Sequence, residues 1–192
     1  MSTRTTRILG IDPGLTRCGV GVIDLAPGRR VNLVSVDVYR SEPTEELSNR
    51  IGSLALRIES LIQDSKPDVI ALERVYADVN VRSVMGTAQI SGVVLMLAHK
   101  YSLPIALHTP TEVKAAVTGS GRADKKQVGT MVAKILGLAE VPKPADAADS
   151  LAIAICHAWR GAAASTGSSG SLTAAQEAWQ QAERAAAKSR ER

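Results

Sequence analysis

The sequence contains no phenylalanine, and aromatic residues make up only 3% of its 192 residues. A hydrophobic core must therefore be built from Ala, Val, Leu and Ile. The sequence also lacks any apolar run near the ~20 residues that span a bilayer. Residues 1–7 lead into a short strand pattern instead of the apolar core of a signal peptide. We therefore expect no membrane segment and a cytoplasmic location.

Cysteine is nearly absent as well. Cys18 and Cys156 are the two cysteines of the chain, which are too few for a disulfide framework and have no metal-binding spacing. We expect both to be reduced thiols. Apolar residues (45%) and charged residues (22%) occur at the frequencies of ordinary globular proteins, which excludes wholesale disorder.

The net charge of +4 is small, but it is concentrated in one part of the chain. Residues 113–134 contain five basic residues and one acidic residue, Asp124, so this segment carries a charge equal to the net charge of the whole chain. A localised basic stretch is typical of a surface that faces a polyanion, although a solvated helix face has the same composition. The basic residues are Lys114, Arg122, Lys125, Lys126 and Lys134.

Hydrophobic periodicity predicts a mixed α/β domain. Three β-branched runs near the N-terminus predict an antiparallel meander, and the following segments alternate between helical periodicity and short apolar strands. This order predicts a central sheet with helices on both faces. The expected strands are 7–11, 18–25, 31–39, 68–75 and 104–108, and the expected helices are 44–61, 81–98, 109–117, 124–136 and 145–159.

The composition changes after Gly161. Residues 162–171 are almost entirely Ala, Ser, Gly and Thr, which bury too little apolar surface to stay ordered alone. Residues 174–192 contain good helix formers without a continuous apolar stripe. We predict a folded domain over 1–161 and a flexible tail, at most a marginal helix, over 162–192.

Two acidic residues stand out in or next to predicted strands. Asp12 ends the first strand in the segment IDPG, where it could serve only as a turn residue. Glu73 interrupts the apolar run VIALERV, where an unpaired carboxylate would be costly. Its neighbour Arg74 points to the opposite face of a strand and cannot pair with it. Glu73 therefore has either a distant structural partner or a role in a site.

Two more acidic residues begin the last predicted helix, in the segment DAADSLAIAICH. Asp146 and Asp149 have the i, i+3 spacing that places both carboxylates on one helix face, where they repel each other. Helix capping explains one of them, and the helix dipole favours both. Capping explains the pair less well, so a role in binding a cation remains equally open.

Four carboxylates without a His or Cys cluster suit a hard cation such as Mg²⁺ or Mn²⁺. Two such ions would activate a water, stabilise a leaving oxygen and screen an anionic phosphodiester from the carboxylates. The basic stretch would supply contacts to a nucleic-acid backbone. Strands and a helix that carry carboxylates in this way are typical of the RNase H-like nucleases.

Four segments together resemble the RuvC family of bacterial Holliday-junction resolvases. The resemblance covers residues 7 to 160, in order and with intervals like those of the family. The four segments are GIDPGLTRCGVGVI, ALERVYADVNVRSVMGTAQISGVVL, TPTEVKAAVTGSGRADKKQV and PADAADSLAIAICH.

The resemblance implies an RNase H-like fold, in which a three-strand antiparallel meander is joined by parallel strands. It also implies a homodimer that nicks four-way junctions symmetrically with Mg²⁺, two ions per active site, and works with the RuvA and RuvB branch-migration proteins in recombination and DNA repair. The family's acidic tetrad falls on Asp12, Glu73, Asp146 and Asp149. Its DNA-contacting lysines fall on Lys114 and Lys125, and Lys126 and Arg122 are their neighbours. Tyr76 stands where the family often has Phe, and a tyrosine can still stack on a base.

Three other functions compete with this one. YqgF-like relatives share the strand–Asp–Gly opening and act on RNA, but they lack the DAADSLAIA form of the last helix. An actin-like phosphotransferase would share Asp12, Gly14 and Thr16, yet a domain of this length cannot supply its two lobes. A junction-binding protein without catalysis would have no use for four mutually repelling carboxylates.

Overall fold

The computed structural model describes residues 5–75 and 81–166, and within them a five-stranded mixed sheet has the order β3-β2-β1-β4-β5. Strands β1, β2 and β3 pair antiparallel as consecutive strands, whereas β4 and β5 are parallel to β1. This confirms the predicted meander with added parallel strands. The strands are β1 (Thr6–Asp12), β2 (Arg17–Ala26), β3 (Arg30–Arg40), β4 (Val69–Glu73) and β5 (Ile105–His108).

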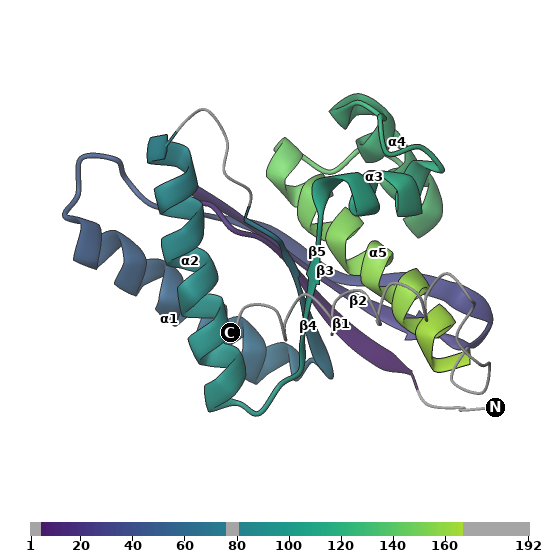
Figure 1. Ribbon diagram of the computed structural model, residues 1–192, viewed down its shortest axis with the longest axis horizontal. Helices are drawn as coiled ribbons and strands as arrows, with labels where there is room; N and C mark the ends of the chain where they lie inside the picture. The colour runs from purple at the N-terminus through teal and green to yellow at the C-terminus, as the bar shows by residue number, and fades with distance from the viewer. Residues whose placement is uncertain (1–4, 76–80, 167–192) are drawn as a thin grey trace, which may run out of the picture. The chain divides into compact units, whose positions relative to one another are not determined.

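Helices cover both faces of the sheet, as the sequence predicts. One face packs against α1 (Leu47–Ser65) and α2 (Val81–Lys100), and the other lies under α3, α4 and α5 (Figure 1). Each face has its own core, because alternate strand residues such as Ile8 and Leu9 point to opposite sides. The helices of the second face are α3 (Pro110–Thr118), α4 (Lys125–Leu136) and α5 (Ala145–Thr166).

The ends of α3 and α4 follow local sequence signals. Thr109 and Asp124 each form a capping box with the side chain three residues later. Gly119 and Gly137 end the two helices in the left-handed conformation, with φ of 81° and 65°. These caps fix where α3 and α4, the helices that carry the lysines of the basic stretch, begin and end.

The bounds of two helices differ most from the sequence prediction. Helix α1 begins at Leu47 and not at Thr44, because a turn closed by a hydrogen bond from Glu45 N to Glu42 O occupies the preceding residues. Helix α5 continues from Trp159 to Thr166, through an Ala-rich segment of high helix propensity. Residues 167–192 lie outside the described residues, so the predicted flexible tail stays a prediction.

Three glycines let α5 lie directly on the sheet. A Cβ at Gly10 would fall 2.2 Å from Ser150 O, and one at Gly19 would fall 2.1 Å from Asp146 O. A Cβ at Gly21 would meet the Leu151 side chain at 2.8 Å. The backbone of α5 therefore packs against β1 and β2 without intervening side chains. This contact holds the first turns of α5 beside the end of β1.

The described residues contain no helix that is long and apolar enough to cross a membrane. Cys18 and Cys156 are both buried and free of disulfide bonds. Burial raises the pKa of the Cys18 thiol to about 12 and that of the Cys156 thiol to about 11. The thiols are therefore packing groups in the two cores.

Candidate active site

The site begins at the carboxyl ends of two parallel neighbours, β1 and β4. Ile11 pairs with Leu72 in the ladder, so the next residues, Asp12 and Glu73, end the two strands side by side. Their carboxyl groups are joined by a hydrogen bond. The strand ends therefore bring together two acidic residues that lie far apart in the sequence.

Helix α5 adds Asp146 and Asp149 to this pair. The close packing of Gly19 against Asp146 O holds the helix start against β2. The charge of Asp149 raises the pKa values of both Asp12 and Glu73, and that of Asp146 raises the pKa of Asp12. All four predicted acidic residues therefore form one electrostatically coupled group, which we call the carboxylate cluster.

Burial and mutual repulsion raise the pKa values of two carboxyl groups in this cluster, those of Asp12 and Glu73. Burial, followed by the charges of Glu73 and Asp149, raises the pKa of Asp12 to about 8. Burial also raises the pKa of Glu73, again with the charge of Asp149 acting in the same direction. At neutral pH the Asp12–Glu73 pair therefore holds a proton.

Two basic side chains pair with the other two carboxylates of the cluster, Asp146 and Asp149. Lys125 Nζ on α4 donates to Asp149 Oδ2 at 2.9 Å, and this hydrogen bond raises the pKa of Lys125. Arg17 Nε at the start of β2 lies 3.2 Å from Asp146 Oδ2. Each aspartate of α5 thus has its own cation, supplied by a different element.

Arg17 was not among the residues that the sequence pattern selected. Its position in the sequence nevertheless contains a usable signal. Asp12 pairs with Gly19 across the β1–β2 hairpin, so a residue two positions before Gly19 must lie near the end of β1. The concentration of charge in the sequence selects the basic residues between 113 and 134, and Arg17 lies outside that stretch.

The other predicted cations lie at different distances from the cluster. Lys114 on α3 is close enough for its charge to oppose the rise in the pKa of Glu73. Lys126 is exposed in the first turn of α4. Arg122 is exposed in the loop between α3 and α4. Tyr76 lies outside the described residues, so its predicted contact with bases stays a prediction.

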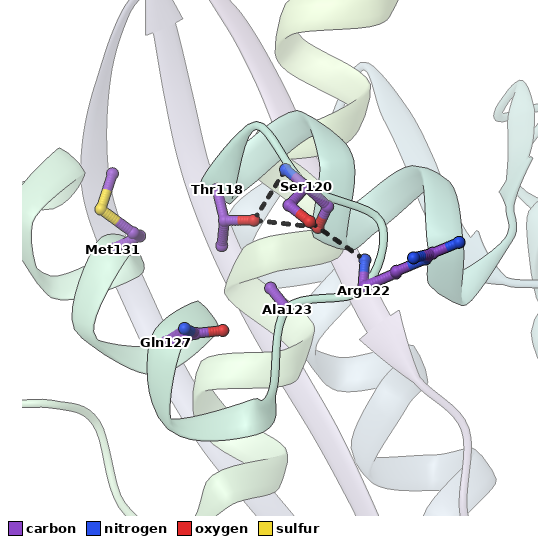
Figure 2. Close-up of a pocket in the computed structure, with 6 residues that line it drawn as sticks. All are labelled: Thr118, Ser120, Arg122, Ala123, Gln127 and Met131. Carbon is purple, nitrogen blue, oxygen red and sulfur yellow. Dashed lines mark hydrogen bonds between the residues drawn. The ribbon is translucent and has the colours of Figure 1, made fainter.

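The loop that carries Arg122 borders a cavity of about 450 Å³ between α3 and α4. Thr118 Oγ1 accepts a hydrogen bond from Ser120 N at 3.1 Å, and Ser120 Oγ accepts one from Arg122 N at 3.3 Å (Figure 2). These bonds shape the loop, while the Arg122 side chain extends outward from it. The cavity contains no acidic side chain among its lining residues, which are Thr118, Ser120, Arg122, Ala123, Gln127 and Met131.

His108 is the ladder partner of Glu73, but the described residues show no hydrogen bond or ion pair between a histidine and the carboxylate cluster. His108 Nε2 and His157 Nδ1 lie 3.2 Å apart, where β5 meets α5. Burial lowers the pKa of both rings, so both are neutral at pH 7. The pair is a partly buried link between the sheet and the helix.

The donor set of the cluster fits a hard divalent cation. Within residues 5–75 and 81–166, no three His, Cys, Asp or Glu side chains are already arranged around a metal position. The carboxylates have other partners: Asp12 is hydrogen-bonded to Glu73, and Lys125 and Arg17 bind Asp149 and Asp146. Four carboxylates without His or Cys are the ligands that Mg²⁺ or Mn²⁺ prefers, and a cation there would replace the charge that the proton and the two basic groups now supply.

The sheet order and the placement of the helices define the RNase H-like fold class. The family model described as "Crossover junction endodeoxyribonuclease RuvC" matches residues 8–157. Relatives with that name include one from Saccharopolyspora erythraea, 58% identical over 154 residues, which cover 80% of this chain and 77% of the relative. Another, from Leifsonia xyli, is 53% identical over 197 residues and covers 96% of this chain and 95% of the relative.

Solved structures agree with the sequence relatives. The Thermus thermophilus RuvC structure in complex with a Holliday junction substrate superposes with a TM-score of 0.77 at 32% identity, over 81% of this chain and 94% of that one. The yeast mitochondrial Holliday junction resolvase Ydc2 matches at a TM-score of 0.58 and 16% identity, which extends the likeness of fold alone. The chain belongs to the RuvC family of crossover junction endodeoxyribonucleases, and it is therefore a nuclease that acts on DNA.

Proposed function

We propose that this nuclease resolves Holliday junctions by metal-dependent hydrolysis of phosphodiester bonds at the carboxylate cluster. Membership of the RuvC family supports junctions as the substrate and recombination and DNA repair as the setting. The observation that carries the proposed site is the convergence of Asp12, Glu73, Asp146 and Asp149 at one end of the sheet, with Lys125 bonded to the group.

Asp12, Glu73, Asp146 and Asp149 would hold the metal, which we propose to be Mg²⁺, with Mn²⁺ as a substitute and two ions in each site. When bound, the ions supply an activated water and stabilise the leaving oxygen. The chain itself must prepare the cluster, because the Asp12 carboxyl holds a proton at neutral pH. Loss of that proton frees an oxygen of Asp12 to act as a ligand.

The lysines would hold the DNA near the cluster. Lys125 has a side chain that is 74% exposed although its Nζ reaches Asp149, so it can turn to a phosphate at the site without rearranging α4. Lys114, Lys126 and Arg122 would contact the backbone further along α3 and α4. We propose that Tyr76 stacks on an unpaired base near the crossover.

Resolution of a junction needs two opposed nicks, and one site per chain therefore requires two chains related by a two-fold axis. We propose that α2 forms the contact between them. Met85 is 54% exposed and Leu95 is 47% exposed on α2, and Ala88 and Gly92 lie exposed between them at helical spacing. A Cβ at Gly92 would meet nothing within 4 Å, so a second helix could approach closely there.

We also propose a cytoplasmic location and cooperation with the RuvA and RuvB branch-migration proteins, as the family resemblance implies. The experiment that tests the proposed function is cleavage of a synthetic mobile four-way junction with and without Mg²⁺. Paired nicks at opposed positions that require the metal would support it. Cleavage of linear duplex or RNA at the same rate would contradict it.

A further inference from the structure

A second group of cations lies beside the carboxylate cluster, outside the predicted basic stretch. Arg17 and Arg40 are direct partners in the β2–β3 ladder. Directly paired residues of antiparallel strands project from the same face of a sheet. Arg17 reaches Asp146 of α5, so Arg40 also projects on the α5 side. Lys143, just before α5, borders with Arg40 a groove of about 290 Å³.

The groove is basic on this face. Asp37 is the one acidic residue among its lining residues, and it pairs with Val20, whose side chain belongs to the core under α1 and α2. The Asp37 side chain therefore takes the opposite face, where its Oδ2 lies 3.7 Å from Arg57 Nη2 on α1. Arg40 and Lys143 are left as the ionic side chains of the groove, and Arg17, the ladder partner of Arg40, lies next to the cluster.

The backbone that carries both arginines is held firmly. Ser41 N donates to Thr16 O at 3.2 Å, immediately beyond the Arg17–Arg40 pair. Arg50 of α1 then donates to Ser41 Oγ and Thr16 Oγ1, both at 3.0 Å. The two arginines therefore start from a fixed framework, which lowers the entropy cost of presenting them to a ligand.

Folding alone gives no reason for this pair. Like charges directly opposite each other on a sheet are destabilising. Asp146 offsets only Arg17, whose Nε faces it, and the Arg17 side chain is still 55% exposed. A guanidinium group has five N–H donors, so Arg17 can bind an anion while it remains next to Asp146. A polyanion along the groove would compensate all three cations.

We propose that Arg17, Arg40 and Lys143 bind the phosphate backbone of a junction arm on the β2–β3 side of the carboxylate cluster. This inference rests on the proposed function and adds a contact surface to it. The residues of this surface lie on β2, β3 and the segment before α5, whereas Lys114 lies on α3 and Lys125 and Lys126 lie on α4. A strand cleaved at the cluster would be held on both sides of the cleaved bond.

The test measures affinity for a four-way junction in EDTA at several salt concentrations. Arg40→Ala and Lys143→Ala should each weaken binding several-fold and lower the slope of log affinity against log salt by about 0.9. The matched control is Arg30→Ala, because Arg30 is exposed at the other end of the same strand. Thermal melting of each variant shows that the fold is kept.

Arg17 needs a different comparison, since its removal also leaves Asp146 without a partner. Asp146→Asn removes that charge, and adding Arg17→Ala to it tests the DNA contact alone. The double variant should bind the junction several-fold more weakly than Asp146→Asn. Equal affinity would make Arg17 a partner of Asp146 and nothing more.

The outcomes separate this inference from the proposed function. If the wild type binds and cleaves junctions while Arg40→Ala and Lys143→Ala bind like Arg30→Ala, the second surface is wrong and the proposed function stands. If the wild type neither binds nor cleaves a junction, both are wrong. Reduced salt slopes in the groove variants, with the control unchanged, are the result expected here.

Discussion

Gly19 of β2 lies directly against the carbonyl oxygen of Asp146, so close that a Cβ would fall 2.1 Å from it. The absence of a side chain at Gly19 thus sets the position of the first turn of α5. Because Asp146 and Asp149 occupy that turn and the next, the distance between α5 and the end of β1 depends on this glycine.

Gly19→Ala should therefore damage both stability and activity. The new methyl group must push α5 away from β2, and overpacking of this kind costs about 1–3 kcal/mol. Urea unfolding should show that loss, and junction cleavage should fall by more than the unfolded fraction explains. Gly52→Ala on α1 is the control, since its Cβ would meet nothing within 4 Å and should leave stability equal or higher. Full activity in Gly19→Ala would show that the spacing is unimportant.

Local patterns in the sequence predicted the order of the elements and drew attention to the four acidic residues, and the resemblance to a known family assigned these four to one site. The sequence could not predict that Arg17 pairs with Asp146, since that contact depends on the register of β1, β2 and α5 together. It also placed the end of α5 too early, because Gly161 was read as a boundary whereas the helix continues through the alanines that follow.

The pKa of Asp12 makes a prediction for stability in EDTA. Its folded value of about 8 lies above the ordinary 3.8, so the folded protein keeps a proton that the unfolded chain loses. Stability should therefore fall as pH rises between those values, by up to about 1.4 kcal/mol per pH unit. Asp12→Asn removes this dependence.

The measurement is urea unfolding of the wild type and of Asp12→Asn at pH 5 and at pH 8. The free energy of unfolding of Asp12→Asn, minus that of the wild type, should be larger at pH 8 than at pH 5. Contributions from His108 and His157 are common to both proteins and cancel in the difference. Parallel curves for the two proteins would mean that Asp12 is ionised in the folded protein.

Lys125 and Lys114 should differ in how they affect cleavage. Alanine at either position should lower the salt slope of junction binding by about 0.9. Lys125 is bonded to the cluster itself, so Lys125→Ala should also lower the cleavage rate by more than the affinity. Lys134→Ala, in the last turn of α4, is the control. Unchanged salt slopes in both variants would mean that the basic stretch is a solvated helix face and does not contact DNA.

If the dimer forms through α2, a charge introduced at an exposed apolar residue of that helix should separate the two chains. Light scattering should give about twice the 20.2 kDa mass of the chain at micromolar concentration. Leu95→Glu would place a charge in the proposed contact and should yield monomers that still bind DNA but no longer make paired nicks. Leu56→Glu on α1 is the control, because Leu56 is also exposed but lies on the neighbouring helix. A dimer that survives Leu95→Glu and not Leu56→Glu would move the interface to α1.

The most direct test of the carboxylate cluster measures binding and cleavage of the same four-way junction side by side. Asp146→Asn, Asp12→Asn and Glu73→Gln should bind the junction as tightly as the wild type or more tightly, while cleavage in Mg²⁺ falls to background. Chains of wild type mixed with Asp146→Asn should accumulate junctions nicked in one strand. Correctly folded variants that cleave at the wild-type rate, or that lose binding and cleavage equally, would contradict the account.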